Sequence, residues 1–334
     1  MTAKPLIALA MGDPAGISPE LTAKLVAQDE IRARCRLVVI GDRRIFDKGA
    51  RIAGVGSELK MMEQGADLRA AQEDALFVDL RHLDPREVEP KTATLAGGKF
   101  ALANYGHALQ LGRDGHVDAV CFTPFNKQAM RLARAEYDDE IAFSAEIVGL
   151  KSPASEFNVL DRLWNARVTS HIPLRDVAAK LSGERIRRAL QLTDSCMRNA
   201  GFARPRIAVA GLNPHAGDGG NFGREEIDVI APVVAASQRE GIAAEGPFPA
   251  DTVFLRAKAG AFDAVLTMYH DQGQIAMKLM GFDRGVTLLG GFPFPISTPA
   301  HGTAYDIAGQ GIASIGASRA ALLLAAEMAV RRRR

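Results

Sequence analysis

The sequence predicts an α/β protein in which a mainly parallel sheet carries helices on both faces. Short apolar runs of strand length alternate along the chain with longer runs of helical character, which is the pattern of parallel α/β folds. The chain has 334 residues, which is enough for two such domains. Hydrophobic residues make up 47% and charged residues 24%, so the composition is that of a globular protein and excludes a disordered or fibrous one.

Six short apolar runs are expected to form buried strands. They are Leu6–Met11, Leu37–Ile40, Ala119–Phe122, Arg167–Ser170, Ile207–Ala210 and Ala264–Met268. One helix is expected over Pro19–Ala27, opened by Ser18 with proline at the first helical position, and another over the alanine-rich run Lys99–Leu111. A terminal helix from Ser318 ends in four arginines, whose charge suits the negative end of the helix dipole.

Charge and cysteine content exclude several classes of partner. The 41 basic and 39 acidic residues are interspersed and leave a net charge of +2, so we expect no binding of nucleic acid or of an anionic membrane. No apolar run approaches the roughly 20 residues of a membrane span, and none has the form of a secretory signal. Cys35, Cys121 and Cys196 are widely spaced and odd in number, which indicates no disulfide framework. We therefore expect a soluble protein of the cytoplasm.

Three of the seven histidines, His171, His215 and His270, follow strand-like runs. The carboxyl ends of parallel strands line one edge of a sheet, so these side chains can meet there although they are far apart in sequence. Neutral imidazoles bind Zn, Co, Ni or Mn, and three of them leave positions open for a substrate. Taken singly, each would more often be an ordinary loop histidine, and their spacing matches no compact metal motif. Together they predict a catalytic metal site. Asp176, Asp218 and Asp271, which follow or adjoin the three histidines, could each orient an imidazole, although aspartates in loops are more often turn residues.

A loop near the C-terminus is the candidate for a dinucleotide site. No strand is followed by the Gly-x-Gly-x-x-Gly pattern, so a Rossmann site is disfavoured. The segment Pro299–Gly311 instead offers backbone amides, the Tyr305 ring to lie against adenine, and the Asp306 carboxylate to bind a ribose. That carboxylate would repel a 2′-phosphate. By composition alone, the segment is more readily an ordinary loop that leads into a helix.

Six motifs spread along the chain resemble those of one enzyme family. They are Gly12-Asp13-Pro14-Ala15-Gly16-Ile17, Thr123-Pro124 with Asn126-Lys127, Ser170 to Asp176, Leu212 to Gly217, Pro249 to Thr252, and Tyr269 to Gly273. Together they resemble the 4-hydroxythreonine-4-phosphate dehydrogenase family, which has the isocitrate/isopropylmalate dehydrogenase-like fold. The resemblance implies two α/β/α domains with a cleft between them. A cofactor-side domain would comprise residues 1–125 and 285–334, and a metal-binding and dimerisation domain residues 126–284.

The resemblance also implies the cofactors and the assembly. In the family, the histidines that match His171, His215 and His270 bind a divalent metal at the interface of a homodimer; we expect Zn, with Co, Ni, Mn or Mg as alternatives. The C-terminal loop resembles the adenosine-binding loop of the β-decarboxylating dehydrogenases, in which an Asp-Ile pair goes with NAD rather than NADP. The cofactor contacts implied are His301, Gly302, Thr303, Ala304, Asp306 and Ile307.

The expected substrate pocket departs from the family pattern. Where phosphate-handling members have Gly-His-Thr-Glu, this chain has Asp139-Glu140-Ile141-Ala142, and the family's substrate-binding Asn and Arg fall at Thr287 and Ile296. Only the family's lysine is retained, as Lys278. A carboxylate repels a phosphate dianion, and isoleucine cannot donate the two hydrogen bonds of arginine, so these differences predict a substrate without phosphate.

A branch of the family that also lacks these residues acts on ring cis-dihydrodiol carboxylates, such as the dihydrodiol of terephthalate. Ile141 and Ile296 would suit a flat ring, and so would Phe143, Phe292 and Phe294. Packing in the core explains the three phenylalanines equally well. The resemblance to this branch predicts a role in aromatic catabolism.

The function that we expect is therefore a metal- and NAD-dependent dehydrogenase of a non-phosphorylated hydroxy acid, with decarboxylation of its ketone product. The metal would lower the pKa of the substrate hydroxyl while hydride passes to NAD. Lys278, Asp251 and Lys127 are the candidates for acid–base catalysis, with Lys278 first. One alternative is 4-hydroxythreonine-4-phosphate dehydrogenase activity itself. An acyl- or phosphotransferase, which would share the fold without needing the three histidines, is an alternative of another class.

Overall fold

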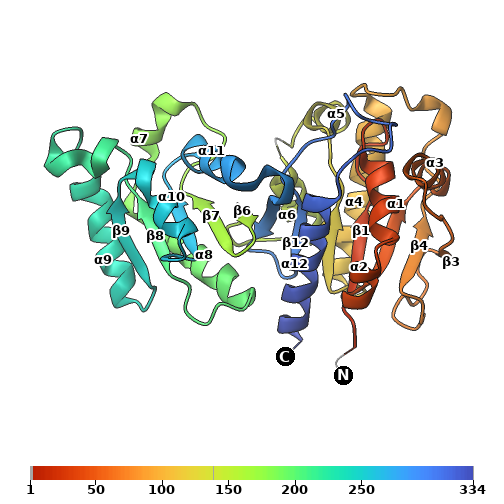
Figure 1. The fold of residues 1–334 in the computed structure, drawn as a ribbon, viewed down its shortest axis with the longest axis horizontal. Helices are drawn as coiled ribbons and strands as arrows, with labels where there is room; N and C mark the ends of the chain where they lie inside the picture. Colours follow the sequence, from red (N-terminus) through yellow and green to blue (C-terminus); the bar gives the residue numbers. More distant parts are fainter. Residues whose placement is uncertain (1–2, 138, 334) are drawn as a thin grey trace. The chain divides into compact units, whose positions relative to one another are not determined.

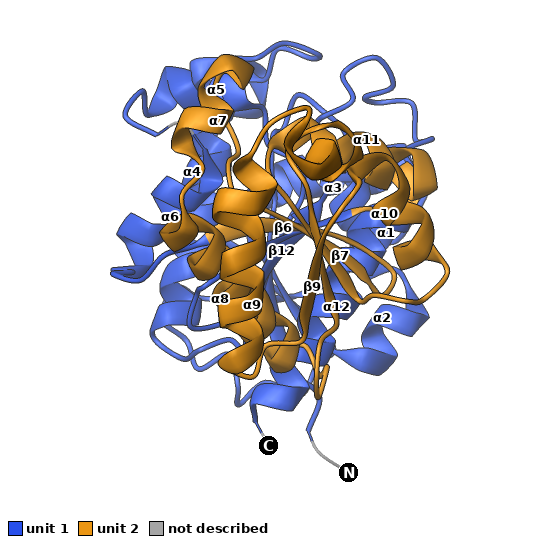
Figure 2. Cartoon of the chain, turned by 90° about the vertical axis from the view of Figure 1, so that its left-hand side faces the viewer, with its two compact units in different colours: residues 1–154, 286–334 blue, residues 155–285 orange. Residues whose placement is uncertain are grey.

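The computed structural model describes residues 3–137 and 139–333 and is drawn in Figure 1. The chain divides into two compact units, which Figure 2 colours separately. Unit 1 comprises Met1–Ala154 and Val286–Arg334, and unit 2 comprises Ser155–Gly285. Residues 126–154 lie in unit 1 in this division. The functional division that we expect from the sequence stays a prediction.

The strands of unit 1 run in the order β3-β4-β2-β1-β5-β12-β11. In that order, their bounds are Lys60–Met62, Ala75–Asp79, Arg36–Gly41, Leu6–Ala10, Ala119–Phe122, Ile296–Pro299 and Val286–Gly290. Neighbouring strands are parallel, except that β11 and β12 are antiparallel. The residues of β1 and β5 are all buried, because helices cover both faces of a parallel sheet and neither side of a central strand meets water.

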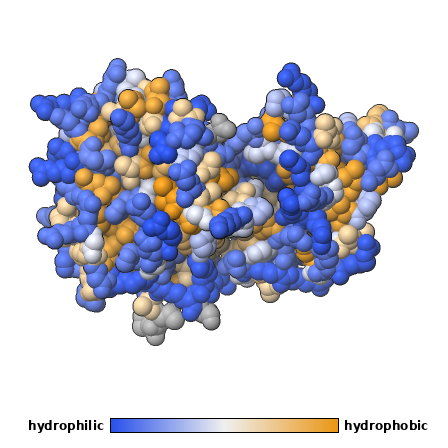
Figure 3. Space-filling model, turned by 180° about the vertical axis from the view of Figure 1, so that it is seen from behind, coloured by the Kyte–Doolittle hydropathy of each residue, from blue (hydrophilic) through white to orange (hydrophobic). Residues whose placement is uncertain are grey.

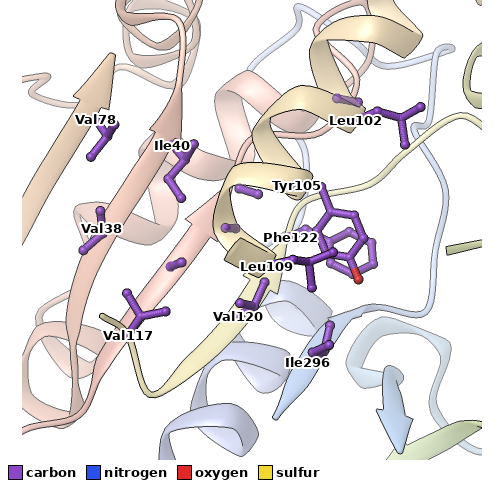
Figure 4. Close-up of a cluster of buried hydrophobic side chains, with 14 of the residues drawn as sticks. Val38, Ile40, Val78, Leu102, Tyr105, Leu109, Val117, Val120, Phe122 and Ile296 are labelled. Atoms are coloured by element: carbon purple, nitrogen blue, oxygen red, sulfur yellow. The ribbon is translucent and has the colours of Figure 1, made fainter. Parts of the chain in front are cut away.

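Helices cover the two faces of these strands, as Figure 1 shows. Their bounds are Ser18–Val26 (α1), Asp29–Arg34 (α2), Arg43–Ala53 (α3), Leu95–Arg113 (α4), Lys127–Ala133 (α5), Glu140–Val148 (α6) and Gly316–Arg332 (α12). α4 lies across β1, β2 and β5 and packs with α5 and α6, whereas α12 lies on the opposite face with α1, α2 and α3. The main core lies between α4 and the strands, where the ring of Tyr105 is 4.5 Å from that of Phe122 (Figure 4).

The strands of unit 2 run in the order β6-β7-β10-β8-β9. In that order, their bounds are Ser155–Leu160, Leu163–Arg167, Ala264–Thr267, Ile207–Ala210 and Ala244–Phe248. β6 is antiparallel to β7, and the other neighbours are parallel. α8 and α9 cover one face and α10 and α11 the other. The helices of this unit are Val177–Lys180 (α7), Gly183–Asn199 (α8), Ala231–Arg239 (α9), Ala250–Lys258 (α10) and His270–Gly281 (α11).

The predicted α/β class is confirmed, and β5 and β8 match the expected strands at both ends. The strand expected at Arg167–Ser170 is wrong, because β7 ends at Arg167. Two buried polar residues, Asn165 and Arg167, interrupt its apolar pattern; the Asn165 amide donates to carbonyl oxygens of both β7 and β10. Ser18 is the first residue of α1 rather than its cap, and its hydroxyl donates to the carbonyl oxygen of Pro124.

The surface is largely hydrophilic in the view of Figure 3, and the three thiols are buried. On the face shown in Figure 3, hydrophilic residues surround scattered apolar patches. None of the helices in the described part of the chain is long and apolar enough to cross a membrane. Cys35, Cys121 and Cys196 are all buried, and burial raises the pKa of the Cys35 and Cys121 thiols to about 12.

Candidate functional site

The three candidate metal ligands follow neighbouring strands of unit 2. β7, β10 and β8 are adjacent and parallel, so their carboxyl ends lie at one edge. His171 comes shortly after β7 and His215 shortly after β8, while His270 is the first residue of α11, which follows β10. All three side chains are at least partly exposed. The topology therefore provides the common edge that the sequence predicts for them.

Two of these histidines lie close together. The ring centroids of His171 and His270 are 5.7 Å apart. The Nδ1 atom of His270 lies 2.6 Å from a carboxylate oxygen of Asp271, so in the neutral ring Nδ1 carries the proton and Nε2 keeps a lone pair for a metal ion. Among residues 3–137 and 139–333, no three His, Cys, Asp or Glu side chains form a group that could hold a metal ion. Within this chain, His215 does not complete a site with the other two.

His215 stands at the start of an unusual loop. The five residues His215–Gly219 all have positive φ, at 53°, 54°, 84°, 45° and 65°. The loop leaves β8 over the carboxylate of Glu226, which is buried. One oxygen of Glu226 accepts hydrogen bonds of 2.7 Å from the backbone N–H groups of both Leu212 and Asn213, and the other accepts one of 2.9 Å from the Asn213 amide. Burial alone would raise the pKa of Glu226, but these hydrogen bonds outweigh it and lower the pKa.

Sequence reasoning missed Glu226 entirely. It lies at the start of a short π-helical turn, Glu226–Ile230, which precedes α9. The signal in the sequence was the cluster of glycines between residues 211 and 223. The structure shows why one of them is needed: a Cβ atom on Gly217 would lie only 2.8 Å from a carboxylate oxygen of Glu226. A glycine that leaves room for a buried carboxylate indicates a close and specific contact.

A surface cavity of about 650 Å³ in unit 2 adjoins this loop. Its polar lining includes His215, Asp251 and Asp271, and its apolar lining includes Ile275 and Leu279 of α11. Asp251, a candidate acid or base, therefore shares a cavity with one candidate ligand. Lys278 does not line this cavity; its side chain is exposed, and its ammonium nitrogen lies 5.7 Å from the centre of the Phe282 ring.

In unit 1, the glycine-rich motif after β1 packs against the end of β5. The backbone N–H of Gly12 donates to the Thr123 hydroxyl at 2.9 Å, and a Cβ on Gly12 would lie 2.2 Å from the Thr123 carbonyl oxygen, so no other residue fits. The next residue, Asp13, is 1% exposed and accepts a 2.5 Å hydrogen bond from the Tyr305 hydroxyl. Burial raises the pKa of Asp13 despite this bond.

The candidate dinucleotide loop is fastened to α1. The Glu20 carboxylate accepts from the backbone N–H groups of Gly311 and Ala313, and the Lys24 ammonium donates to their carbonyl oxygens. Ala304 has a φ of 43°, a strained value for alanine. In the same loop, Asp306 is exposed. The loop thus keeps a fixed backbone while its carboxylate faces solvent.

The remaining cofactor positions of this loop differ in exposure. Thr303 is buried, and its carbonyl oxygen accepts from the Ile17 backbone N–H at 3.0 Å. Gly302 is exposed, whereas His301 and Ile307 are half-buried. Backbone contacts between the two motifs therefore hold the loop at Thr303, next to the strained residue.

Apart from Lys278 in unit 2, the predicted substrate positions lie in unit 1 and differ in their environments. Glu140 is the first residue of α6, and one of its carboxylate oxygens lies 3.7 Å from the ammonium nitrogen of Lys127. Ile141 and Thr287 are half-buried, and Ile141 packs on the main core. Ile296 has no exposed surface and belongs to the core itself (Figure 4).

The three phenylalanines near these positions are core residues. Phe143 and Phe294 are buried in the main cluster, and Phe292 packs partly buried against it. The Phe143 ring lies 5.3 Å from that of Tyr137, edge to face. Packing therefore accounts for these rings without a ligand.

Comparison with known proteins decides the family. The model of a family described as pyridoxal phosphate biosynthetic protein PdxA matches residues 33–325. The chain belongs to this family. It is 61% identical, over 99% of its length and 95% of the relative's, to a Rhizobium meliloti protein named "Putative 4-hydroxythreonine-4-phosphate dehydrogenase 2". It is 38% identical to the 4-hydroxythreonine-4-phosphate dehydrogenase of Geobacter metallireducens, over 98% of this chain and 96% of that one. It is also 37% identical to the D-threonate 4-phosphate dehydrogenase of Cupriavidus necator, over 98% of both.

Solved structures agree with the family. The 4-hydroxythreonine-4-phosphate dehydrogenase of Klebsiella pneumoniae is 34% identical, with a TM-score of 0.83 over 98% of this chain and all of that one. The terephthalate 1,2-cis-dihydrodiol dehydrogenase of Burkholderia xenovorans is 29% identical, with a TM-score of 0.65 over 95% of this chain and 96% of that one. A branched-chain phosphotransacylase of Enterococcus faecalis, 10% identical with a TM-score of 0.51 over 99% of this chain and all of that one, shares the fold alone.

The predicted substrate class was wrong. Relatives that are 61% and 38% identical carry the names of dehydrogenases for a phosphorylated substrate, whereas the enzyme for a ring cis-dihydrodiol is 29% identical. The expectations of a cis-dihydrodiol substrate and of aromatic catabolism are therefore withdrawn. Two of the differences that suggested them have structural explanations, since Ile296 is a core residue, and Glu140 begins a helix, where an acidic side chain is favoured by the helix dipole.

Proposed function

We propose that this protein is a metal- and NAD-dependent 4-hydroxythreonine-4-phosphate dehydrogenase. The observation that carries the proposal is the pairing of His171 and His270 at neighbouring strand ends in a chain of this family. Oxidation of the substrate's 3-hydroxyl transfers hydride to NAD and releases the hydroxyl proton. The product is a ketone β to a carboxylate, which then loses CO2, so the enzyme is also proposed to be decarboxylating.

His171 and His270 suit a divalent ion. Their rings are close enough to share one, and the contact between His270 Nδ1 and Asp271 leaves Nε2 available for it. When bound, a divalent ion acts as a Lewis acid on the substrate hydroxyl. Imidazole ligands are compatible with Zn, and Co, Ni, Mn or Mg are alternatives. We assign the third ligand to His215 of a second copy, because His215 is exposed and does not join the other two within one chain.

A homodimer would supply that second copy. Several large apolar side chains of unit 2 are exposed, among them Leu279 at 83%, Ile275 at 61% and Leu255 at 67%. They belong to α10 and α11, next to the cavity that contains His215. Burying such a patch in a subunit interface would remove it from water, which is the usual fate of exposed apolar clusters. We propose that α10 and α11 form this interface.

The C-terminal loop is proposed to hold NAD. His301, Gly302, Thr303 and Ala304 would offer backbone groups to the cofactor, and the exposed Asp306 would accept hydrogen bonds from a ribose, with Ile307 beside it. A carboxylate at this point would repel the 2′-phosphate of NADP. The residues that pack behind this loop would act only by keeping its backbone ordered.

Roles for the lysines and for Asp251 follow from charge and position. Lys278, Asp251 and Lys127 remain the proposed candidates for moving the hydroxyl proton, and Asp251 lines the same cavity as His215. Lys278 and Lys127 are exposed cations that would attract a phosphate dianion. The ion pair between Lys127 and Glu140 places a negative charge beside one of them, and with Ile141 and Thr287 these residues are proposed to select among substrates of similar shape.

A turnover assay tests the function. Purified protein is supplied with Zn²⁺, Co²⁺, Mn²⁺ or Mg²⁺, with NAD or NADP, and with 4-hydroxythreonine-4-phosphate; reduced cofactor is followed at its absorbance band. D-threonate 4-phosphate tests the activity named for the Cupriavidus necator relative. Unphosphorylated 4-hydroxythreonine is the matched control. NADH formation only with the phosphorylated amino acid supports the proposal, and turnover of neither phosphate ester would reject it.

A further inference from the structure

The loop that carries His215 has a strained backbone. Three of its five left-handed residues, His215, Ala216 and Asp218, have side chains that disfavour positive φ. The left-handed conformation brings the Cβ atom close to the following carbonyl oxygen, which is least tolerable at Ala216, because Asp and His adopt it more often. Strained backbone of this kind persists only where its surroundings hold it in place, and it is common at functional sites. The groups that hold this loop are therefore part of how His215 is presented.

The carboxylate of Glu226 contacts this loop. It is 2% exposed, and its carboxylate accepts the three hydrogen bonds from Leu212 and Asn213, immediately before the strained residues. Gly211 and Gly217, on either side, also lie against it, because a Cβ atom on either would come within 3.0 Å of a Glu226 oxygen. The carboxylate therefore contacts the loop before and within its left-handed run.

A second side chain links the same backbone to the other ligands. The amide nitrogen of Gln272 donates to the Gly211 carbonyl oxygen at 2.7 Å, and its amide oxygen accepts from the Met268 backbone N–H at 2.7 Å. Met268 lies between β10 and His270. Through Gln272, the start of the His215 loop is joined to the segment that carries His270.

We propose that Glu226 is a positioning residue for His215: it holds the left-handed loop in the conformation that offers the imidazole to a divalent ion. It would touch neither substrate nor cofactor. This inference rests on the proposed function, since it assumes that His215 is a metal ligand. The adjacent glutamate, Glu225, accepts a 2.7 Å hydrogen bond from the Asn213 side chain. Within residues 3–137 and 139–333 no backbone N–H donates to its carboxylate, so it serves as the control.

The test compares Glu226→Ala, Glu226→Gln and Glu225→Gln in the full chain. Zn²⁺ affinity is measured by competition with a chromogenic chelator, kcat and KM are measured separately, and thermal unfolding is followed without metal. We expect Glu226→Ala to weaken Zn²⁺ binding by about 10–100-fold, the usual effect of losing a group that orients a ligand. Glu226→Gln keeps an oxygen for the two backbone N–H groups and should lose only several-fold. Glu225→Gln should bind as the unchanged protein does.

Unchanged Zn²⁺ affinity in Glu226→Ala, with only a lower melting temperature, would overturn the proposal and make Glu226 purely structural. If Glu226→Ala does not fold, unchanged affinity in Glu226→Gln would overturn it in the same way. His215→Ala separates this inference from the proposed function: undiminished Zn²⁺ binding there rejects His215 as a ligand, whereas lost binding there together with unchanged binding in both Glu226 variants rejects only the positioning role.

Discussion

Two buried carboxylates hold loops in the two units, and their hydrogen bonds differ. Glu226 in unit 2 accepts from three N–H groups of Leu212 and Asn213, whereas Asp13 in unit 1 accepts from one backbone N–H and from the Tyr305 hydroxyl. Both are almost fully buried, at 2% and 1% exposure. Burial raises the pKa of Asp13, while in Glu226 the hydrogen bonds outweigh burial and lower the pKa. The difference teaches that the balance between burial and accepted hydrogen bonds sets the direction in which the pKa of such a group moves.

The charges suit the ligands that we propose for the two units. An ionised carboxylate behind His215 adds negative charge near a cation. Asp13 lies beside the loop proposed to hold NAD, where its hydrogen bond to the Tyr305 hydroxyl ties the loop to the glycine-rich motif. The pKa of Glu226 is lowered and that of Asp13 is raised, and each of the following changes tests this difference.

The largest effect is expected at a metal ligand. His270→Ala removes one of the two paired imidazoles and should abolish metal binding and lower kcat by about 10³-fold, since a Lewis acid contributes several kcal/mol and each 1.36 kcal/mol is tenfold. Metal content and NADH formation measure both effects. His116→Ala, an exposed histidine in unit 1, is the control and should change neither. Full metal content in His270→Ala would count against the metal site.

The next effect compares the two carboxylates directly by replacing each with its amide. Glu226→Gln should lower the free energy of unfolding by about 1.5–3 kcal/mol, because a charged acceptor of several N–H groups is lost. Asp13→Asn should cost less, since the Asp13 carboxyl accepts two hydrogen bonds where that of Glu226 accepts three. Urea unfolding at neutral pH measures both variants. Equal losses would show that the hydrogen-bond count does not distinguish the two sites.

A smaller effect is expected at Tyr305. Tyr305→Phe removes the hydrogen bond to Asp13 and loosens the loop at Ala304 without touching the metal site. The KM for NAD should rise about 2–10-fold, because this factor corresponds to the free energy of one hydrogen bond. The kcat should change little. Tyr137→Phe, which removes a buried hydroxyl elsewhere in unit 1, should leave the KM for NAD unchanged. A fall in kcat alone would place Tyr305 in the chemistry instead.

The smallest effect is a difference in pH dependence. The folded-state pKa of Asp13 is above its ordinary value of 3.8, so its contribution to stability is present below pH 3.8 and is lost as the pH rises through the folded pKa. That of Glu226 is below 4.5, so its contribution is present above pH 4.5 and is lost as the pH falls through the folded pKa. The stability differences between the unchanged protein and Asp13→Asn or Glu226→Gln should therefore have opposite slopes with pH. Slopes of the same sign in urea unfolding would contradict the comparison.

Strands with continuous apolar sequence were predictable, and strands with buried polar residues were not. β5 and β8 follow directly from their composition, because both faces are covered. In β7, the buried Asn165 joins two strands, and a pattern based on hydrophobicity cannot see such a hydrogen bond. The periodicity of hydrophobic residues indicates where apolar side chains are buried. It does not indicate polar side chains that are buried with a hydrogen-bond partner.

The site shows the same limit. The order of neighbouring strand ends brings His171 and His270 together, and the parallel-sheet pattern was enough to expect that. Glu226 was missed because its importance depends on a left-handed backbone that no local pattern announces. The substrate was misjudged because Ile296 was counted as a pocket residue, and only the structure places it in the core.

The burial of every cysteine has a practical consequence. Thiols react as thiolates, and with pKa values raised to about 12, Cys35 and Cys121 carry almost no thiolate at neutral pH. The native chain should therefore resist maleimide reagents, and a cysteine placed at an exposed position should be labelled selectively. Leu279→Cys, on the exposed face of α11, would carry a fluorophore whose emission reports whether a second subunit covers that helix in solution.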